Sequence, residues 1–293
     1  MSFITTTDKV KLYVKDWGRG RPVIMMHGWP LSSDSFDDLS MAIANCGMRA
    51  IAYDRRGFGR SDQPWSGYDY NTLADDLAAV MEQTGARDAT LLGFSMGGGE
   101  VARYMSRHGG QNVRQAILAS SVVPYMLKTD DNPHGVEQEV FAKMTEGVQE
   151  DRAKFWTNFF KDFYGVGMVS HPVSDEVLAW SRDVSMQASL KATLDCAAAF
   201  ATTDFRSDLA AFKVPTLVIH GTKDKTVPID CSGRAAAQGI STATLIEYDG
   251  APHGLFASHK TRFIDDILQF LQTSEARMTT QPSGTRRADP VTV

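Results

Sequence analysis

The chain has 293 residues, of which 43% are hydrophobic and 22% are charged, and its formal net charge is −5 with an isoelectric point near 5.8. This length and composition indicate a globular protein with one core and added elements, and they exclude wholesale disorder. Acidic and basic residues are interspersed, which argues against a nucleic-acid partner or an anionic membrane surface. The only compact basic cluster is RRGFGR, residues 55–60.

The chain shows no targeting signal and no segment that could span a bilayer. The N-terminal stretch MSFITTTDKV lacks a basic region followed by an apolar run. A cytoplasmic location is therefore expected. The three cysteines, Cys46, Cys196 and Cys231, are odd in number and widely spaced, which predicts reduced, buried thiols instead of disulfides or a metal site.

In chain order, the first predicted element is a hairpin of two alternating segments, residues 2–6 and 11–16. Six short apolar runs follow and predict buried strands. These runs are residues 23–26, 50–52, 90–92, 116–118, 216–219 and 244–246. Helical patterns lie between them at 35–45 and 72–84, the second capped by Asn71 and Thr72 and closed at Gly85. This alternation predicts a mostly parallel sheet with helices on both faces.

The alternation of strands and helices stops in the middle of the chain. Residues 124–208 are helical in pattern and rich in aromatic side chains, which predicts a helical cap over the carboxyl ends of the strands. Residues 1–123 and 209–272 are then expected to form one core. From residue 273 to 293 the composition shifts to Thr, Ser, Pro, Gly and Arg, which predicts a disordered tail.

Four glycines surround one serine in GFSMGGG, residues 93–99. A phosphate-binding P-loop needs a lysine after its glycines, where this chain has Glu100, and the dinucleotide fingerprint needs a glycine in place of Ser95. The remaining pattern, G-x-S-x-G between a strand and a helix, is typical of a nucleophilic serine on a strained turn. The glycines next to the serine would permit the turn, and the last two would let the helix pack closely.

A serine hydroxyl is a poor nucleophile near neutral pH and needs a base that a carboxylate orients. Asp224 follows the predicted strand 216–219, and His253 follows 244–246. Serine, aspartate and histidine at successive strand ends is the order that hydrolases of this topology use. The rival acids, which lack this loop position, are Asp204, Asp230 and Asp249.

The other histidines offer no metal spacing of the HxxxH kind. His27 directly follows a predicted strand, where a structural role in its loop is expected. No partner is evident from the sequence for His108, His134, His171, His220 and His259.

Acyl transfer places negative charge on a carbonyl oxygen, which two preorganised backbone N–H groups can stabilise. One donor is expected to be Met96, the residue after the nucleophile. The other is expected in the loop HGWP, where Pro30 has no N–H, so that Trp29 is the natural donor.

With these residues placed, the chain resembles the cofactor-free haloperoxidase and aryl esterase branch of the α/β-hydrolases. The resemblance extends to about Leu271 and implies the α/β-hydrolase fold, with an α/β architecture of a mostly parallel eight-stranded sheet, helices on both faces and a helical cap insertion. It rests on the segments KDWGRGRPV, MHGWPLS, AYDRRGFGRSDQPW, YDYNTLADDL, LLGFSMGGGEVARY, SLKATLDC, FRSDL, VPTLVIHGTKD and APHG.

The resemblance implies hydrolysis of small carboxylic esters through an acyl-serine, without cofactor or metal. It also implies perhydrolysis, in which hydrogen peroxide replaces water and the peracid formed oxidises bromide or chloride. Ser95 would be the nucleophile, His253 the general base and acid, and Asp224 the orienting acid. A proline at position 30 is associated in the family with stronger perhydrolysis. Relatives often assemble as trimers or pairs of trimers, so a homo-oligomer is implied.

Relatives also imply which residues line the acyl and alcohol pockets, although about half of these could be plain core packing. These residues are Pro30, Phe94, Val122, Tyr125, Met126, Met144, Phe159, Phe163, Phe200, Val227 and Ile229. Where relatives carry phenylalanine, Met126 and Met144 would soften the pocket wall. Two alternatives stay open, a γ-lactamase or amidase with the same triad and a non-catalytic receptor of this fold. A haloalkane dehalogenase is disfavoured, because that chemistry needs a carboxylate in place of Ser95.

Overall fold

The computed structural model describes residues 3–279, and its centre is an eight-stranded sheet with the order β1-β2-β4-β3-β5-β6-β7-β8. β2 pairs antiparallel with β1 and β4, whereas the remaining neighbours pair in parallel. The strands are β1 Phe3–Thr5, β2 Lys11–Gly18, β3 Pro22–Met26, β4 Arg49–Tyr53, β5 Ala89–Phe94, β6 Val113–Ala119, β7 Thr216–Gly221 and β8 Ala243–Tyr248. The predicted sheet and its edge hairpin are confirmed.

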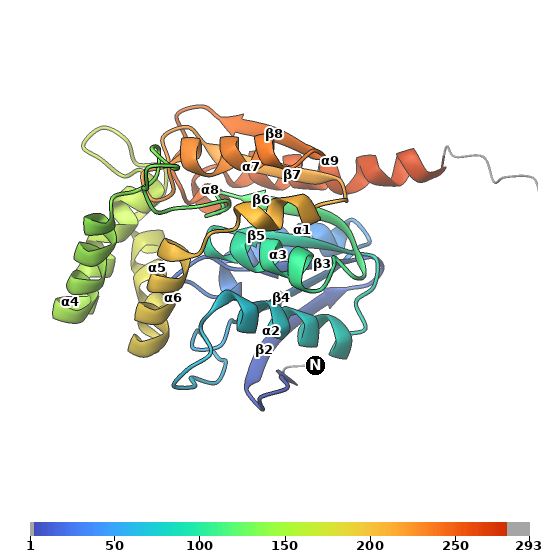
Figure 1. Cartoon of the computed structure of the whole chain (residues 1–293), viewed down its shortest axis with the longest axis horizontal. Helices are drawn as coiled ribbons and strands as arrows, with labels where there is room; N and C mark the ends of the chain where they lie inside the picture. The colour runs from blue at the N-terminus through green and yellow to red at the C-terminus, as the bar shows by residue number, and fades with distance from the viewer. Residues whose placement is uncertain (1–2, 280–293) are drawn as a thin grey trace, which may run out of the picture.

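Helices cover both faces of the sheet (Figure 1), which is why β3, β5 and β7 are buried along their whole length. α1 Asp37–Asn45 contacts α9 Lys260–Thr279, and α2 Tyr70–Gln83 packs on α3 Met96–Arg107, so that the two pairs form separate layers. The shorter elements are η1 Ser33–Phe36, η2 Arg206–Ala211, η3 Ile229–Cys231, α7 Gly233–Gly239 and α8 Leu255–Ser258.

Three long helices between β6 and β7 form the insertion that the sequence predicts. They are α4 Gln138–Tyr164, α5 Asp175–Met186 and α6 Leu190–Thr202. α4 packs against both α5 and α6, and the group lies beside one end of the sheet (Figure 1). The helical character of residues 124–208 is confirmed, while their treatment as a separate cap stays an interpretation.

Two of the helix ends that the sequence placed wrongly have local causes. α2 begins at Tyr70 because Asp69 is the cap, and its carboxylate accepts from Asn71 N–H at 3.0 Å and Thr72 N–H at 3.1 Å. α9 continues through Thr279, past the expected start of a tail at residue 273. The sequence there contains Ser, Glu, Ala, Arg and Met, most of which favour helix and extend a helix already formed. Residues 280–293, the rest of the predicted tail, lie outside the described residues.

The cysteines carry no disulfide, as predicted, but their burial differs. Cys196 and Cys231 are buried. Cys46 is exposed because it follows the last residue of α1 at the C-cap, so the prediction of a buried side chain is wrong there. Among residues 3–279, no helix combines the length and apolar character needed to cross a membrane.

Candidate active site

Ser95 occupies the sharp turn between β5 and α3, and its backbone is strained. Its φ of 54° and ψ of −119° are unusual for a residue with a side chain, at a cost of about 1–3 kcal/mol that the surroundings must offset. The Ser95 N–H donates to the carbonyl of Ala119 at 2.8 Å, and the Ser95 carbonyl accepts from Gly98 at 3.0 Å and Val122 at 3.2 Å. The predicted strained strand-to-helix turn is confirmed.

The glycines around Ser95 are required by close backbone approaches. A Cβ on Gly97 would lie 2.2 Å from the Met26 carbonyl oxygen of β3. A Cβ on Gly99 would lie 2.4 Å from the Tyr70 ring of α2. Real Cβ atoms do not approach so closely, so glycine at these places lets α3 pack against both the sheet and α2.

His253 links Ser95 to Asp224 in one hydrogen-bonded chain. His253 Nε2 lies 2.9 Å from Ser95 Oγ, and His253 Nδ1 lies 2.6 Å from Asp224 Oδ2. Because a carboxylate only accepts, the ring proton belongs on Nδ1, and the lone pair of Nε2 faces the serine hydroxyl. The imidazole is fully buried, with Phe94 at 5.1 Å and Phe163 at 4.8 Å between ring centroids. The three strand-end residues from different parts of the chain are therefore brought together.

Asp224 is held as an anion. Its Oδ1 accepts from the N–H groups of Thr226 at 2.9 Å and Val227 at 2.7 Å. Burial by itself would raise the pKa of Asp224, but the charges of His253 and His220 and the hydrogen bonds from their rings lower it to about 2. The carboxylate can therefore stabilise positive charge on His253 at any pH near neutrality.

His220 is a neighbour of Asp224 that the sequence analysis left without a partner. Its Nε2 lies 2.9 Å from the Val227 carbonyl and 3.3 Å from Asp224 Oδ2, and its side chain is fully buried. Both neighbours are acceptors, so Nε2 carries the proton and donates. The available signal was its place at the end of β7, four residues before the acid.

The rival acids bind other groups. Asp204 pairs with Arg206 at 2.6 Å, and Asp230 pairs with Arg234 at 2.7 Å. Asp249 Oδ1 accepts from the Thr222 hydroxyl at 3.3 Å.

The two expected oxyanion donors emerge at the same edge of the sheet as Ser95. β3 and β5 are parallel neighbours with Met26 opposite Gly93, so the loops that follow them lie side by side. Met96 is the first residue of α3, and the first amides of a helix have no acceptor within the helix. The Trp29 indole donates to the Thr193 carbonyl of α6 at 2.9 Å, which anchors this loop to the helical insertion.

A cavity of about 340 Å³ opens at Ser95 between the strand ends and the helical insertion. Its walls are mainly apolar. Of the residues expected at the site, those that line it are Trp29, Ser95, Val122, Met144, Phe159, Phe200 and Val227. Lining residues that the sequence analysis missed are Val136, Val140, Phe141, Lys143, Phe155, Asp162, Lys225 and Thr226. Phe155, Phe159 and Asp162 are spaced so that they lie on one face of α4, and this spacing could have identified them from the sequence.

The other predicted pocket residues do not line this cavity. These are Pro30, Phe94, Tyr125, Met126, Phe163 and Ile229. Phe94 is the last residue of β5, and its ring packs on His253, as the ring of Phe163 also does. Pro30, Met126 and Ile229 are buried, and the Tyr125 ring lies 5.1 Å from the Arg206 guanidinium. The resemblance identified a region correctly, but not which side chains face its interior.

Comparison with known proteins identifies the family. Residues 21–260 match the family model described as the alpha/beta hydrolase fold. The chain belongs to the α/β-hydrolase family. It is 42% identical to a non-heme chloroperoxidase of Kitasatospora aureofaciens over 92% of this chain and 99% of that protein. It is 40% identical to a bifunctional esterase/perhydrolase of Acinetobacter calcoaceticus over 93% of this chain and 100% of that protein.

A solved structure agrees with these sequence relatives. The bromoperoxidase from Bacillus anthracis matches with a TM-score of 0.89 and 41% identity, covering 92% of this chain and 99% of that one. The predicted membership in the haloperoxidase and esterase branch of the α/β-hydrolases is therefore confirmed.

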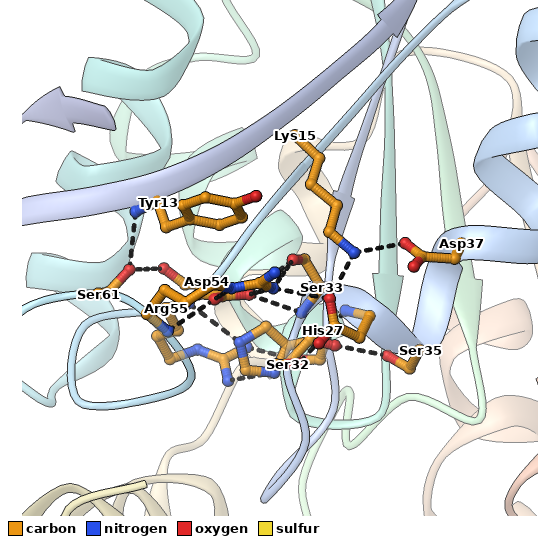
Figure 2. Close-up of polar contacts among 12 residues, drawn as sticks. Tyr13, Lys15, His27, Ser32, Ser33, Ser35, Asp37, Asp54, Arg55 and Ser61 are labelled. Atoms are coloured by element: carbon orange, nitrogen blue, oxygen red, sulfur yellow. Dashed lines mark hydrogen bonds and ion pairs between the residues drawn. The ribbon is translucent and has the colours of Figure 1, made fainter. Parts of the chain in front are cut away.

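In this α/β-hydrolase the basic cluster RRGFGR is a structural network and not a free positive surface. Arg55 pairs with Glu100, Arg56 with Asp76 at 2.6 Å, and Arg60 with Asp54 at 2.8 Å. Figure 2 shows part of this network, in which the Ser33 hydroxyl donates to the Asp54 carboxylate and the Ser61 hydroxyl donates to the Asp54 backbone carbonyl, beside Arg55. These groups tie the loop after β4 to the loops after β3 and to α3.

His27 belongs to this network, as the prediction of a structural histidine requires. Its Nε2 accepts from the Arg55 backbone N–H at 3.0 Å, which leaves the proton on Nδ1, 2.9 Å from the Gly28 carbonyl. Burial and the adjacent Arg55 charge lower the pKa of His27 to about 3, so its ring is neutral. Within residues 3–279, no group of three or more histidine, cysteine or acidic side chains is arranged to hold a metal ion.

Proposed function

We propose that the protein is a serine esterase that cleaves small carboxylic, chiefly aryl, esters through an acyl-enzyme and that also acts as a perhydrolase. The observation that supports this most directly is the continuous chain from Ser95 Oγ through His253 to Asp224, which opens on an apolar cavity. The names of its relatives, a non-heme chloroperoxidase and an esterase/perhydrolase, support the same pair of activities.

In the proposed acylation, Ser95 Oγ attacks the ester carbonyl carbon while His253 Nε2 accepts its proton. The tetrahedral intermediate places its oxyanion between the N–H groups of Trp29 and Met96. Asp224 stabilises the imidazolium that forms, and this imidazolium then protonates the departing alcohol or phenol. The acyl group is left as an ester on Ser95.

In the proposed second half, a water or a hydrogen peroxide molecule enters the cavity. His253 removes its proton as it attacks the acyl carbon, and Ser95 leaves with a proton returned from His253. Water yields the carboxylic acid, and peroxide yields the peracid, which oxidises bromide or chloride in solution. Halide oxidation is thus a consequence of acyl transfer.

The test of the esterase proposal is turnover of 4-nitrophenyl acetate by the wild-type protein and by Ser95→Ala. We expect the variant to lose about three orders of magnitude or more in kcat, because the nucleophile acts as a unit with its base. Ser106→Ala is a matched control on the exposed end of α3, and it should keep wild-type turnover. Equal rates for wild type and Ser95→Ala would defeat the proposal, and a γ-lactam substrate assayed in parallel separates an amidase.

The perhydrolase proposal is tested at Pro30, which is buried and directly follows the proposed donor Trp29. A shift of the Trp29 carbonyl towards the attacking peroxide is the proposed effect of proline here. Pro30→Leu should therefore lower the ratio of perhydrolysis to hydrolysis, measured as bromination of a dye with peroxide against release of acid without it. An unchanged ratio would show that Pro30 does not promote perhydrolysis.

A further inference from the structure

Arg55 and Glu100 form an ion pair in the interior of the protein, and each side chain is only 1% exposed. Arg55 Nε donates to Glu100 Oε1 at 2.6 Å, Arg55 Nη2 contacts the same oxygen, and the Tyr53 hydroxyl donates to Oε2 at 2.6 Å. A buried ion pair contributes little net stability compared with apolar side chains of the same volume. Stability alone is therefore a poor explanation for this pair.

The Arg55 side chain also holds the loop that carries Trp29. Its Nη2 donates to the His27 carbonyl at 2.5 Å, and the Arg55 backbone N–H donates to His27 Nε2 at 3.0 Å (Figure 2). The opposite edge of the His27 ring donates from Nδ1 to the Gly28 carbonyl at 2.9 Å. The Gly28 carbonyl and the Trp29 N–H belong to one planar peptide group, so whatever orients the first also orients the second.

Glu100 is the group that the Arg55 side chain binds besides the His27 carbonyl. It lies on α3 one helical turn after Met96, the residue that supplies the second proposed donor. The Tyr70 hydroxyl donates to the Met96 carbonyl at 3.1 Å, which adds a second restraint on this first turn. The Arg55–Glu100 pair thus joins the two structural elements that carry the two N–H groups.

We propose that Arg55 and Glu100 are positioning residues that fix the separation and aim of the Trp29 and Met96 N–H groups across the oxyanion site. This inference rests on the proposed function, because the oxyanion exists only during acyl transfer. Arg55 suits the task because its planar guanidinium can bind Glu100 and the His27 carbonyl at the same time, whereas a lysine ammonium lacks that fixed fork. The neutral His27 ring completes the connection because it accepts at one nitrogen and donates at the other.

The test replaces the pair with apolar side chains, Arg55→Met with Glu100→Leu, so that no charge is left unpaired. We expect kcat for 4-nitrophenyl acetate to fall roughly 10- to 100-fold with KM unchanged, because misaligned donors lose part of what a deleted donor loses. The affinity for a trifluoromethyl ketone, whose adduct on Ser95 carries an oxyanion, should fall by a similar factor.

The neighbouring pair Arg56 and Asp76 provides a matched control. It is buried to the same degree and bidentate, but Asp76 lies on α2, and the other partner of Arg56 is Asp8 near the N-terminus. Arg56→Met with Asp76→Leu should change thermal stability by an amount similar to that of the Arg55/Glu100 double variant, while the folded protein keeps wild-type kcat and ketone affinity.

Wild-type kcat and ketone affinity in the Arg55/Glu100 double variant would overturn the inference, as would an equal loss in the control. If that double variant does not fold, the kinetics of Arg55→Lys test the inference instead. A lower kcat at unchanged KM supports the inference, and a wild-type kcat overturns it. Ser95→Ala in the same assay separates the two proposals. If Ser95→Ala keeps its turnover, both the proposed function and the inference are refuted. If turnover depends on Ser95 but is unchanged by the Arg55 and Glu100 substitutions, the inference alone is refuted.

Discussion

The strand-end loops and the helical insertion meet at the same cavity but are constructed differently. In the loops, each chemically important side chain is restrained by backbone hydrogen bonds and by glycines that admit no Cβ, as around Ser95 and Asp224. In the insertion, α4 and α6 contribute a wall of aromatic and aliphatic side chains that interact through ring contacts, such as Phe141 with Phe200 at 6.4 Å. We infer that the loops determine the chemistry and the insertion determines which acyl group fits.

The largest effect is expected in the loops, at Asp224. Asp224→Asn should lower kcat by about 10⁴, because an amide facing His253 Nδ1 favours the wrong ring tautomer. Steady-state kinetics on 4-nitrophenyl acetate measures the loss. Asp249→Asn, which changes the rival acid after β8, should leave kcat unchanged; a similar loss there would mean that the acid is misassigned.

Glycine-to-alanine substitutions, one next to the Ser95 turn and one in the insertion, compare how well the backbone of each region tolerates a Cβ atom. Gly97→Ala would place a Cβ 2.2 Å from the Met26 carbonyl and should reduce the free energy of unfolding by about 3 kcal/mol, with kcat also lowered. Gly167→Ala, between α4 and α5, meets nothing within 4 Å and should change stability by less than about 0.5 kcal/mol. Urea unfolding followed by fluorescence compares the two, and equal costs would contradict the proposed rigidity of the loops.

Lowering the pH should reduce the free energy of unfolding, because Asp224 in its strand-end loop becomes protonated. Its pKa of about 2 in the folded protein is below the ordinary value of 3.8, so its contribution is present above about pH 4 and is lost as pH falls towards 2. The contribution is about 2 kcal/mol by the usual conversion of pKa shifts. Urea unfolding at several pH values should show a stability difference between wild type and Asp224→Asn that shrinks over this range. A constant difference would argue against the lowered pKa.

The smallest expected effect lies in the insertion and concerns selectivity. Phe159→Ala removes a ring from the cavity wall, so kcat/KM for 4-nitrophenyl hexanoate relative to acetate should rise about tenfold, with little change for acetate itself. Phe160→Leu changes the next residue, which is buried but does not line the cavity, and should leave this ratio alone. A drop in acetate turnover as large as that of Asp224→Asn would remove the proposed division between the two regions.

Much of the site could be read from the sequence because its side chains follow strands. Ser95, Asp224 and His253 lie in the loops that follow three of the apolar runs, and parallel strands bring their carboxyl ends to one edge of the sheet. His220 could not be assigned in this way, because its contact with Asp224 depends on how the loop after β7 folds back. The pocket residues were harder still, since a resemblance does not state which way a buried side chain faces.

The sequence by itself determined the sheet, its order of elements and the residues at the strand ends, because strand periodicity and glycine-rich turns are local properties. Only the tertiary structure decided that His253 Nε2 lies 2.9 Å from Ser95 Oγ, that the Phe94 ring packs on His253, and that Arg55 reaches both Glu100 and the His27 carbonyl. These contacts join segments far apart in the chain, and their geometry comes from the packing of helices and loops on the sheet, which no local pattern records.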